Sequence, residues 1–163
     1  MNRNRVGIQL KLGLDFPYDR KWLKSIMGAC LALEDVQQPY EINLVVTDNS
    51  AIHKLNKKYR HIDRPTDVLS FAYREPDSPA GNVEFITPPE EAGYLGEIVI
   101  SYPYIMEQAR DDNRNIEDEL ILIIVHGILH LIGYNHESAG DARKMRLRER
   151  SITSRITKLL RPR

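Results

Sequence analysis

Three histidines, His126, His130 and His136, fall within eleven residues at a spacing that suits one metal ion. An apolar run at 120–125 leads into them with helical periodicity, and residues four apart on a helix share a face. Gly133 can end that helix in a left-handed conformation, so His136 can return from a loop. A histidine on an apolar face is more often a hydrogen-bonded core residue. Three at this spacing instead favour metal binding, with a fourth position open to water as in catalytic zinc sites.

The same spacing resembles the metzincin protease motif, His-Glu-x-x-His-x-x-Gly-x-x-His, with one decisive difference. Gly127 stands where those proteases carry a glutamate. Peptide hydrolysis needs that carboxylate to take a proton from water and pass it to the leaving amine, which glycine cannot do. The sequence therefore argues against a metalloprotease.

The elements that must position the histidines follow from periodicity. Alternating apolar residues predict strands near 6–12, 42–46, 68–73 and 95–101. Helical spacing predicts helices at 17–33, 50–59, 103–112, 116–132 and 139–160, the last of them basic and in one piece or two. We expect an α+β fold, with about four strands in a mixed sheet packed with helices and the His-x3-His helix at its centre.

Length and composition predict a single domain over 1–163, and the three histidines make it a candidate metallo-hydrolase. The segment 74–93, rich in proline and acidic residues, reads as an exposed loop or lid. Cys30 is the single cysteine, which excludes an intrachain disulfide and fits a reducing cytosol; its place on a helical apolar face predicts a core residue. No apolar run suits a signal peptide or a membrane span, so we expect a soluble, cytoplasmic protein with no membrane partner.

Charge is segregated although 23 basic and 23 acidic residues balance. Residues 141–163 hold nine Lys or Arg and two acidic residues, whereas 74–120 holds three basic and twelve acidic residues. Such segregation is typical either of a solvated helix or of a face that binds a polyanion. On the second reading, Arg146 and Arg150 of the basic helix 139–160 would bind the backbone of a nucleic acid.

Three motifs together resemble the bacterial YbeY endoribonucleases. They are the segment from His126 to His136, the segment Arg64-Pro-Thr-Asp-Val-Leu-Ser-Phe71 and the segment Leu95-Gly-Glu-Ile-Val-Ile-Ser101. The resemblance covers about half of the chain, from Leu55 to His136. It implies an α+β fold, a three-histidine metal centre and cleavage of single-stranded RNA. It further implies a role in ribosomal RNA maturation and ribosome quality control, with ribosomal RNA or the small ribosomal subunit as partner.

The resemblance also implies roles for individual residues. His126, His130 and His136 would bind one Zn²⁺ per chain, although histidine sites accept other divalent transition metals. His126 and Arg60 would be the catalytic residues. The planar guanidinium of Arg60 suits the grip of a scissile phosphate.

Two positions depart from the family pattern. Asn135 replaces the usual Asp before the last histidine, and Glu97 replaces Asp in Leu-Gly-Asp. Asn can orient a ligand but cannot act as a carboxylate base. We therefore expect Asn135 and Glu97 to lie behind the ligands and orient them.

Two alternatives remain open. In the first, the chain is an RNA-binding ribosome-assembly factor whose metal is structural. In the second, which concerns the mechanism, the 2′-hydroxyl of RNA attacks in place of water. The remaining motif residues are as compatible with bracing the site as with reacting; these are Thr66, Asp67, Ser70 and Ser101.

Overall fold

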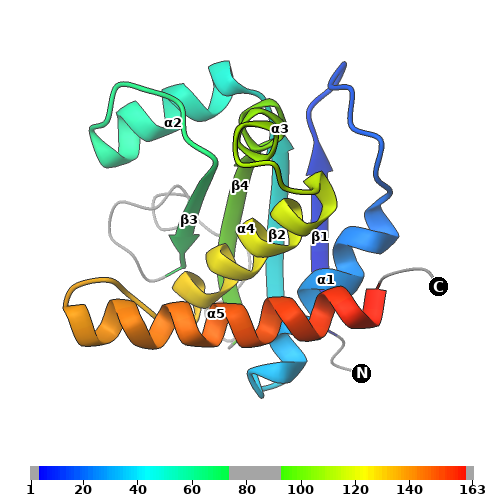
Figure 1. Cartoon of the computed structure of the whole chain (residues 1–163), viewed down its shortest axis with the longest axis vertical. Coiled ribbons are helices and arrows are strands. Elements are labelled where there is room, and N and C mark those ends of the chain that lie inside the picture. The colour runs from blue at the N-terminus through cyan, green and yellow to red at the C-terminus, as the bar shows by residue number, and fades with distance from the viewer. Residues whose placement is uncertain (1–3, 74–92, 161–163) are drawn as a thin grey trace.

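A four-stranded mixed sheet forms the centre of the computed structural model, which describes residues 4–73 and 93–160 (Figure 1). The strand order is β1-β2-β4-β3; β1, β2 and β4 run parallel, and β3 pairs antiparallel with β4 at the edge. The strands are β1 (Arg5–Leu10), β2 (Glu41–Thr47), β3 (Val68–Ala72) and β4 (Tyr94–Ser101). The helices are α1 (Arg20–Leu33), α2 (Asn49–Arg60), α3 (Tyr102–Asp111), α4 (Ile116–Leu131) and α5 (Ala139–Leu160). The predicted α+β class and mixed sheet are confirmed.

The two faces of the sheet carry two separate cores. Along β4, Ile98 and Ile100 belong to a large cluster shared with α1, α4 and α5, whereas Val99 belongs to a smaller cluster that Ile52 of α2 joins. Successive side chains of a strand point to opposite faces, so α4 and α2 must cover opposite sides. Figure 1 shows α4 crossing one face of the sheet, with α5 lying across the end of α4.

The helix α4 is the most buried helix of this fold. Its N-cap, Asn115, accepts hydrogen bonds from the backbone N–H groups of Glu117 and Asp118. It packs against β3, β4, α1, α3 and α5, so nearly its whole circumference is apolar. This confirms the prediction of a central histidine helix.

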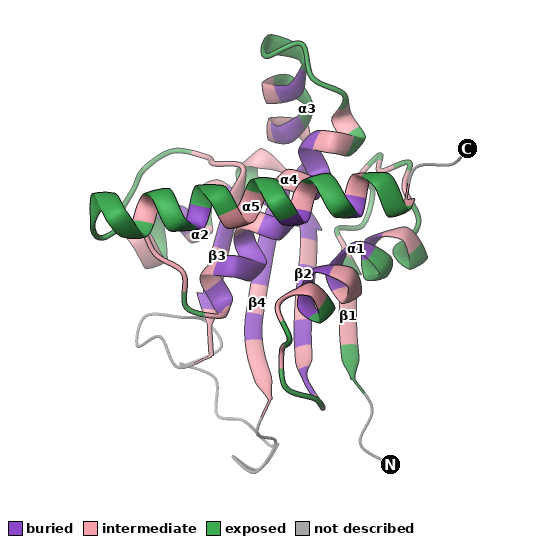
Figure 2. Cartoon of the chain, turned by 60° about the horizontal axis from the view of Figure 1, so that its bottom comes forward, coloured by how far each residue is buried: buried purple, intermediate pink, exposed green. Residues whose placement is uncertain are grey.

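The helix α5 begins and ends at the residues predicted for the basic helix and forms one piece. Met145, Ile152 and Ile156 form its buried side. Figure 2 shows that the opposite side is exposed along the whole helix. Arg148 anchors the helix to α1 through an ion pair with Glu34.

The first strand is shorter in the structure than the sequence predicted. The first strand stops at Leu10 because the chain turns there: the N–H of Leu14 bonds to the carbonyl of Lys11, and Leu12 is 97% exposed rather than half-buried.

The loop predicted at 74–93 lies, except for Gly93, outside the described residues. Within 4–73 and 93–160, no helix combines the length and apolar content needed to cross a membrane. Cys30 is fully buried, as its place on the apolar face predicts.

Candidate metal centre

The three predicted histidines converge through their Nε2 atoms. Nε2 of His130 lies 3.2 Å from Nε2 of His126 and 3.0 Å from Nε2 of His136. Three nitrogens bound at about 2.0–2.1 Å to one tetrahedral zinc ion stand about 3.3 Å apart. The separations of His130 from the other two ligand nitrogens are therefore already close to those that a zinc ion requires. The ligand atoms of the three residues all lie within 4.8 Å of one another.

His126 is oriented from behind by a residue that the sequence did not single out. Its Nδ1 lies 3.1 Å from a carboxylate oxygen of Glu149, on α5. An ionised carboxylate only accepts hydrogen bonds, so Nδ1 of the neutral ring carries the hydrogen and Nε2 keeps its lone pair. The pair holds His126 in the form that a metal binds.

His130 is oriented by the backbone. Its Nδ1 donates to the carbonyl of Tyr134 at 3.1 Å, which again leaves Nε2 with a lone pair. Burial, helped by the adjacent imidazoles of His126 and His136, lowers the pKa of His130 to about 4. At neutral pH the ring is therefore uncharged, as metal ligation requires.

His136 reaches the other two histidines through the turn that ends α4. The N–H of Gly133 bonds to the carbonyl of His130, and the N–H of Tyr134 bonds to the carbonyl of Leu129. This pair of bonds is a Schellman motif, which needs a left-handed residue after the C-cap; Gly133 supplies it with φ +113°. The prediction that Gly133 ends the helix is confirmed.

Gly127 lets α4 approach the sheet closely. A Cβ at this position would lie 3.0 Å from Cγ2 of Ile98 and 3.2 Å from Oγ of Ser70. Ser70 instead donates a hydrogen bond to the carbonyl of Gly127 at 3.1 Å. Any side chain at this position would force Ile98 and Ser70 to give way, so packing disfavours the metzincin glutamate that the sequence already lacks.

Arg60 lies at the edge of the histidine cluster. A hollow of about 280 Å³ is lined jointly by Arg60, Ser70, His126 and His130, with apolar residues of β3 and α4 completing it. Nη2 of Arg60 donates to the carbonyl of Ser70 at 2.7 Å, and the guanidinium stacks over Phe71 at 5.0 Å from its ring centroid. The structure thus brings Arg60 and two of the ligands to one cavity, which could hold a phosphate group.

The two predicted orienting residues do not contact the imidazoles through any hydrogen bond that the described residues make. Glu97 alternates with Ile98 on β4, so it points to the face opposite α4; burial raises its pKa. Oδ1 of Asn135 accepts from the N–H of Glu137 at 3.0 Å. Asn135 therefore shapes the turn that carries His136, and Glu149 takes the place behind a ligand.

The other motif residues brace the fold. Ser101 donates to Oδ1 of Asn49 at 2.7 Å, its N–H bonds to the carbonyl of Asp67, and Thr66 donates to the Asp67 carboxylate. The hydroxyls of Ser70 and Ser101 thus bond to α4 and α2. The hydroxyl of Tyr134 donates to Glu34 at 3.2 Å, linking the site turn to α1.

The two arginines predicted to bind RNA are exposed on α5. Arg146 lies three residues before Glu149, and Arg150 directly follows it. Residues three apart on a helix are surface neighbours, so this basic side of α5 begins next to the carboxylate that holds His126.

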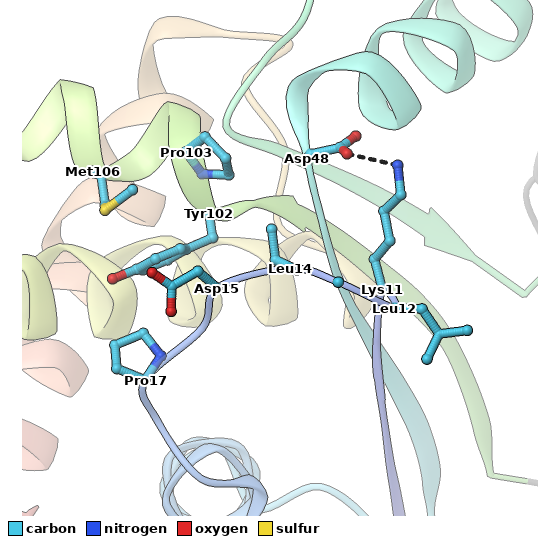
Figure 3. Close-up of a pocket in the computed structure, with 10 residues that line it drawn as sticks. Lys11, Leu12, Leu14, Asp15, Pro17, Asp48, Tyr102, Pro103 and Met106 are labelled. Carbon is cyan, nitrogen blue, oxygen red and sulfur yellow. Dashed lines mark hydrogen bonds and ion pairs between the residues drawn. The ribbon is translucent and has the colours of Figure 1, made fainter.

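A second, larger hollow of about 410 Å³ lies where β1, β2 and β4 end (Figure 3). Lys11 and Asp48 form a 2.6 Å ion pair at its rim, while Tyr102, Pro103 and Met106 of α3 line its apolar side. It shares no lining residue with the hollow beside the histidines, and no histidine or cysteine lines it. Of these two hollows, the smaller one is therefore the one that candidate metal ligands line.

The sequence did contain a signal for Glu149. The residue stands four positions after Met145 and three before Ile152, beside the apolar stripe of an otherwise basic amphipathic helix. An isolated acidic residue in that place must meet a partner across the helix interface. Which partner it meets depends on how α5 packs on α4.

Comparisons with known proteins identify the family to which the chain belongs. The family model for Endoribonuclease YbeY matches residues 11–157. An endoribonuclease YbeY from Roseiflexus sp. (strain RS-1) is 40% identical over 135 residues, which cover 82% of this chain and 81% of that protein. Another, from Chloroflexus aurantiacus, is 36% identical over 146 residues, 89% of this chain and 92% of that one. The solution structure of a Thermotoga maritima protein superposes with a TM-score of 0.61 at 26% identity, covering 94% of this chain and 89% of that chain. The chain belongs to the YbeY endoribonuclease family.

Proposed function

We propose that this chain is a metal-dependent endoribonuclease that hydrolyses phosphodiester bonds in single-stranded RNA. One observation carries the proposal: Nε2 of His130 lies 3.0–3.2 Å from Nε2 of the other two histidines, next to a hollow that Arg60 shares with His126 and His130. The three histidines would hold one Zn²⁺ per chain. The whole chain would act as one metallo-hydrolase domain in the cytoplasm, on ribosomal RNA or the small ribosomal subunit during rRNA maturation.

The metal site is suited to hydrolysis because its ligands are three neutral imidazoles. A zinc ion bound by three protein ligands, when present, supplies Lewis acidity and lowers the pKa of water towards about 7. The chain's own part is to hold the ring nitrogens in place. Glu149 and the Tyr134 carbonyl do so for His126 and His130.

Arg60 is the candidate for binding the scissile phosphate. Its stacking on Phe71 and its hydrogen bond to Ser70 fix the guanidinium at the cavity wall. A fixed guanidinium can stabilise charge that develops on phosphate oxygens without reorganising during the reaction. The exposed arginines of α5, Arg146 and Arg150, would hold the flanking RNA backbone without reading its sequence.

The alternative, an assembly factor with a structural metal, is disfavoured by the ligand set. Structural zinc sites have four protein ligands, whereas only three metal-binding side chains gather in the described part of this chain. The hollow that His126 and His130 line also holds an arginine, Arg60, which a purely structural metal site would not need.

Cleavage of a single-stranded RNA by zinc-loaded protein tests the proposal. Wild type should cut it, a duplex of the same sequence should resist, and His126→Ala and His136→Ala should be inactive. His53→Ala is the matched control, since His53 lies on α2, pairs with Asp63 and is outside the cluster. Equal cleavage by wild type and His126→Ala would show that the activity does not come from the histidine cluster. A substrate with a 2′-deoxy nucleotide at the cleaved bond should still be cut if water attacks, and should resist if the 2′-hydroxyl attacks.

A further inference from the structure

We propose that Glu149 is a positioning residue of the metal centre, which acts through His126 by fixing the ring's tautomer and orientation. The inference rests on the proposed metal site and adds a residue on α5 to it. The sequence motif of the site ends at His136, thirteen residues before Glu149.

The geometry places Glu149 directly behind the ligand. Its carboxylate oxygen lies 3.1 Å from Nδ1, while Nε2 of the same ring faces Nε2 of His130 at 3.2 Å. The carboxylate and the metal position therefore lie on opposite sides of one imidazole. The side chains of His126 and Glu149 are only 26% and 16% exposed, so water competes weakly for the hydrogen bond.

Glu149 is not committed to another cation. Among the residues that the structure describes, His126 supplies the only basic group within 4.0 Å of its carboxylate. Arg146 and Arg150 flank it in sequence but make no ion pair with it in that same set. Within the described residues, the carboxylate thus pairs with the imidazole alone. An acidic residue that only balanced the charge of the basic helix would instead pair with one of its arginines.

The three ligands are held to different degrees. His126 bonds to a carboxylate, and His130 bonds to the Tyr134 carbonyl. For Nδ1 of exposed His136, no hydrogen-bond partner occurs within 4–73 and 93–160. A charged acceptor makes the stronger hydrogen bond, so His126 is the best-fixed ligand and Glu149 is the side chain that fixes it.

Three substitutions of Glu149 distinguish the effect of its hydrogen bond to His126 from the effect of its negative charge. Glu149→Gln keeps an acceptor oxygen at the same reach and loses the charge. Glu149→Asp keeps the charge but is one methylene shorter, so it cannot reach Nδ1. Glu149→Ala loses both. Asp141→Asn is the matched control, since it removes a carboxylate from the exposed first turn of the same helix.

The readouts are the zinc dissociation constant, from competition with a chromophoric chelator, and the visible spectrum of the cobalt(II)-loaded protein. Loss of an orienting partner typically weakens metal binding about 10–100-fold. We expect that loss for Glu149→Ala and Glu149→Asp, with a changed cobalt(II) spectrum. Glu149→Gln should stay closer to wild type than Glu149→Asp does, and Asp141→Asn should be unchanged. Thermal unfolding of the metal-free proteins identifies any variant that fails to fold.

The outcomes distinguish this inference from the proposed function. If wild type binds zinc tightly and all three variants bind equally well, Glu149 is not a positioning residue, although the metal site stands. If Glu149→Asp matches wild type and Glu149→Gln is weak, charge rather than the hydrogen bond is responsible, and the inference is overturned. If wild type itself binds no metal, the proposed function fails first. If Glu149→Ala does not fold, the comparison of Glu149→Gln with Glu149→Asp still shows whether the hydrogen bond positions His126.

Discussion

Nδ1 of His130 donates a hydrogen bond to the carbonyl of Tyr134, four residues further along the chain, at 3.1 Å. The N–H of the same Tyr134 closes the Schellman motif on Leu129, and the chain then runs on to His136. One turn therefore ends α4, orients the second ligand and delivers the third. The geometry of the metal centre is largely the geometry of this turn.

The turn depends on the backbone of Gly133. Its φ of +113° is a conformation that L side chains rarely adopt, although a Cβ at this position would meet no atom within 4 Å. We expect Gly133→Ala to lower the free energy of unfolding by about 1–2 kcal/mol through backbone strain alone. The variant should also bind zinc more weakly, because His136 shifts.

Gly28→Ala is the control for that prediction. Gly28 lies inside α1, likewise with no atom within 4 Å of a Cβ, and its φ is outside the left-handed range. Alanine should stabilise this position by up to about 1 kcal/mol in urea unfolding. Equal effects of the two substitutions would contradict a special role for Gly133.

Restoring the metzincin glutamate should not create a protease. In Gly127→Glu the added Cβ already meets Ile98 and Ser70 at 3.0–3.2 Å. We expect overpacking to lower the free energy of unfolding by about 1–3 kcal/mol, measured in urea, with no peptidase activity on a denatured protein substrate. An unperturbed variant that cleaves peptides would overturn both the packing argument and the exclusion of protease chemistry.

Removing the guanidinium of Arg60 should impair cleavage without removing the metal. We expect Arg60→Ala to lower kcat/KM for RNA by about 10²–10³-fold, the usual effect of losing one donor to developing charge. Arg60→Lys should recover only part of this, because an ammonium lacks the planar fork. Zinc affinity should stay at the wild-type value in both.

Lys57→Ala is the matched control, since Lys57 lies three residues earlier on α2 and its side chain is 67% exposed. It should leave kcat/KM at the wild-type value. If Arg60→Ala behaved like Lys57→Ala, the phosphate role of Arg60 would be refuted.

Charge reversal on α5 should change the salt dependence of RNA binding. For single strands, the slope of log affinity against log salt changes by about 0.7 for each phosphate that the protein no longer neutralises. We expect Arg146→Glu with Arg150→Glu to weaken binding most at low salt and to flatten that slope. Reversal of exposed Arg110 on α3 should leave the slope unchanged. Identical slopes for wild type and the double variant would mean that this side of α5 is merely solvated.

The buried thiol of Cys30 should make the protein sensitive to alkali. Burial raises the pKa of Cys30 from 9.0 to about 12. The unfolded thiol ionises first, so its contribution to stability is full below pH 9.0 and is lost as pH rises from there towards about 12. Urea midpoints should fall more steeply over this range for wild type than for Cys30→Ala. At pH 8, a thiol reagent should modify Cys30 only in denaturant.

Much of this protein follows from its sequence. The spacing of His126, His130 and Gly133 is local information: a helical period places two imidazoles together, and a glycine permits the left-handed turn that ends the helix. The strand and helix pattern likewise indicated the α+β class, because side-chain periodicity reports local geometry. The absence of the metzincin glutamate could be read directly from the sequence, because Gly127 occupies its position.

The tertiary structure decided what lies behind and beside the ligands. Glu149 is thirteen residues beyond His136, and only the packing of α5 on α4 brings it to His126. Arg60, the last residue of α2, reaches a cavity that residues of β3 and α4 line. Glu97 points away because strand alternation, fixed by the register with its neighbours, turns it to the other face. These are contacts between distant segments, and no local pattern encodes which distant side chain meets which ligand.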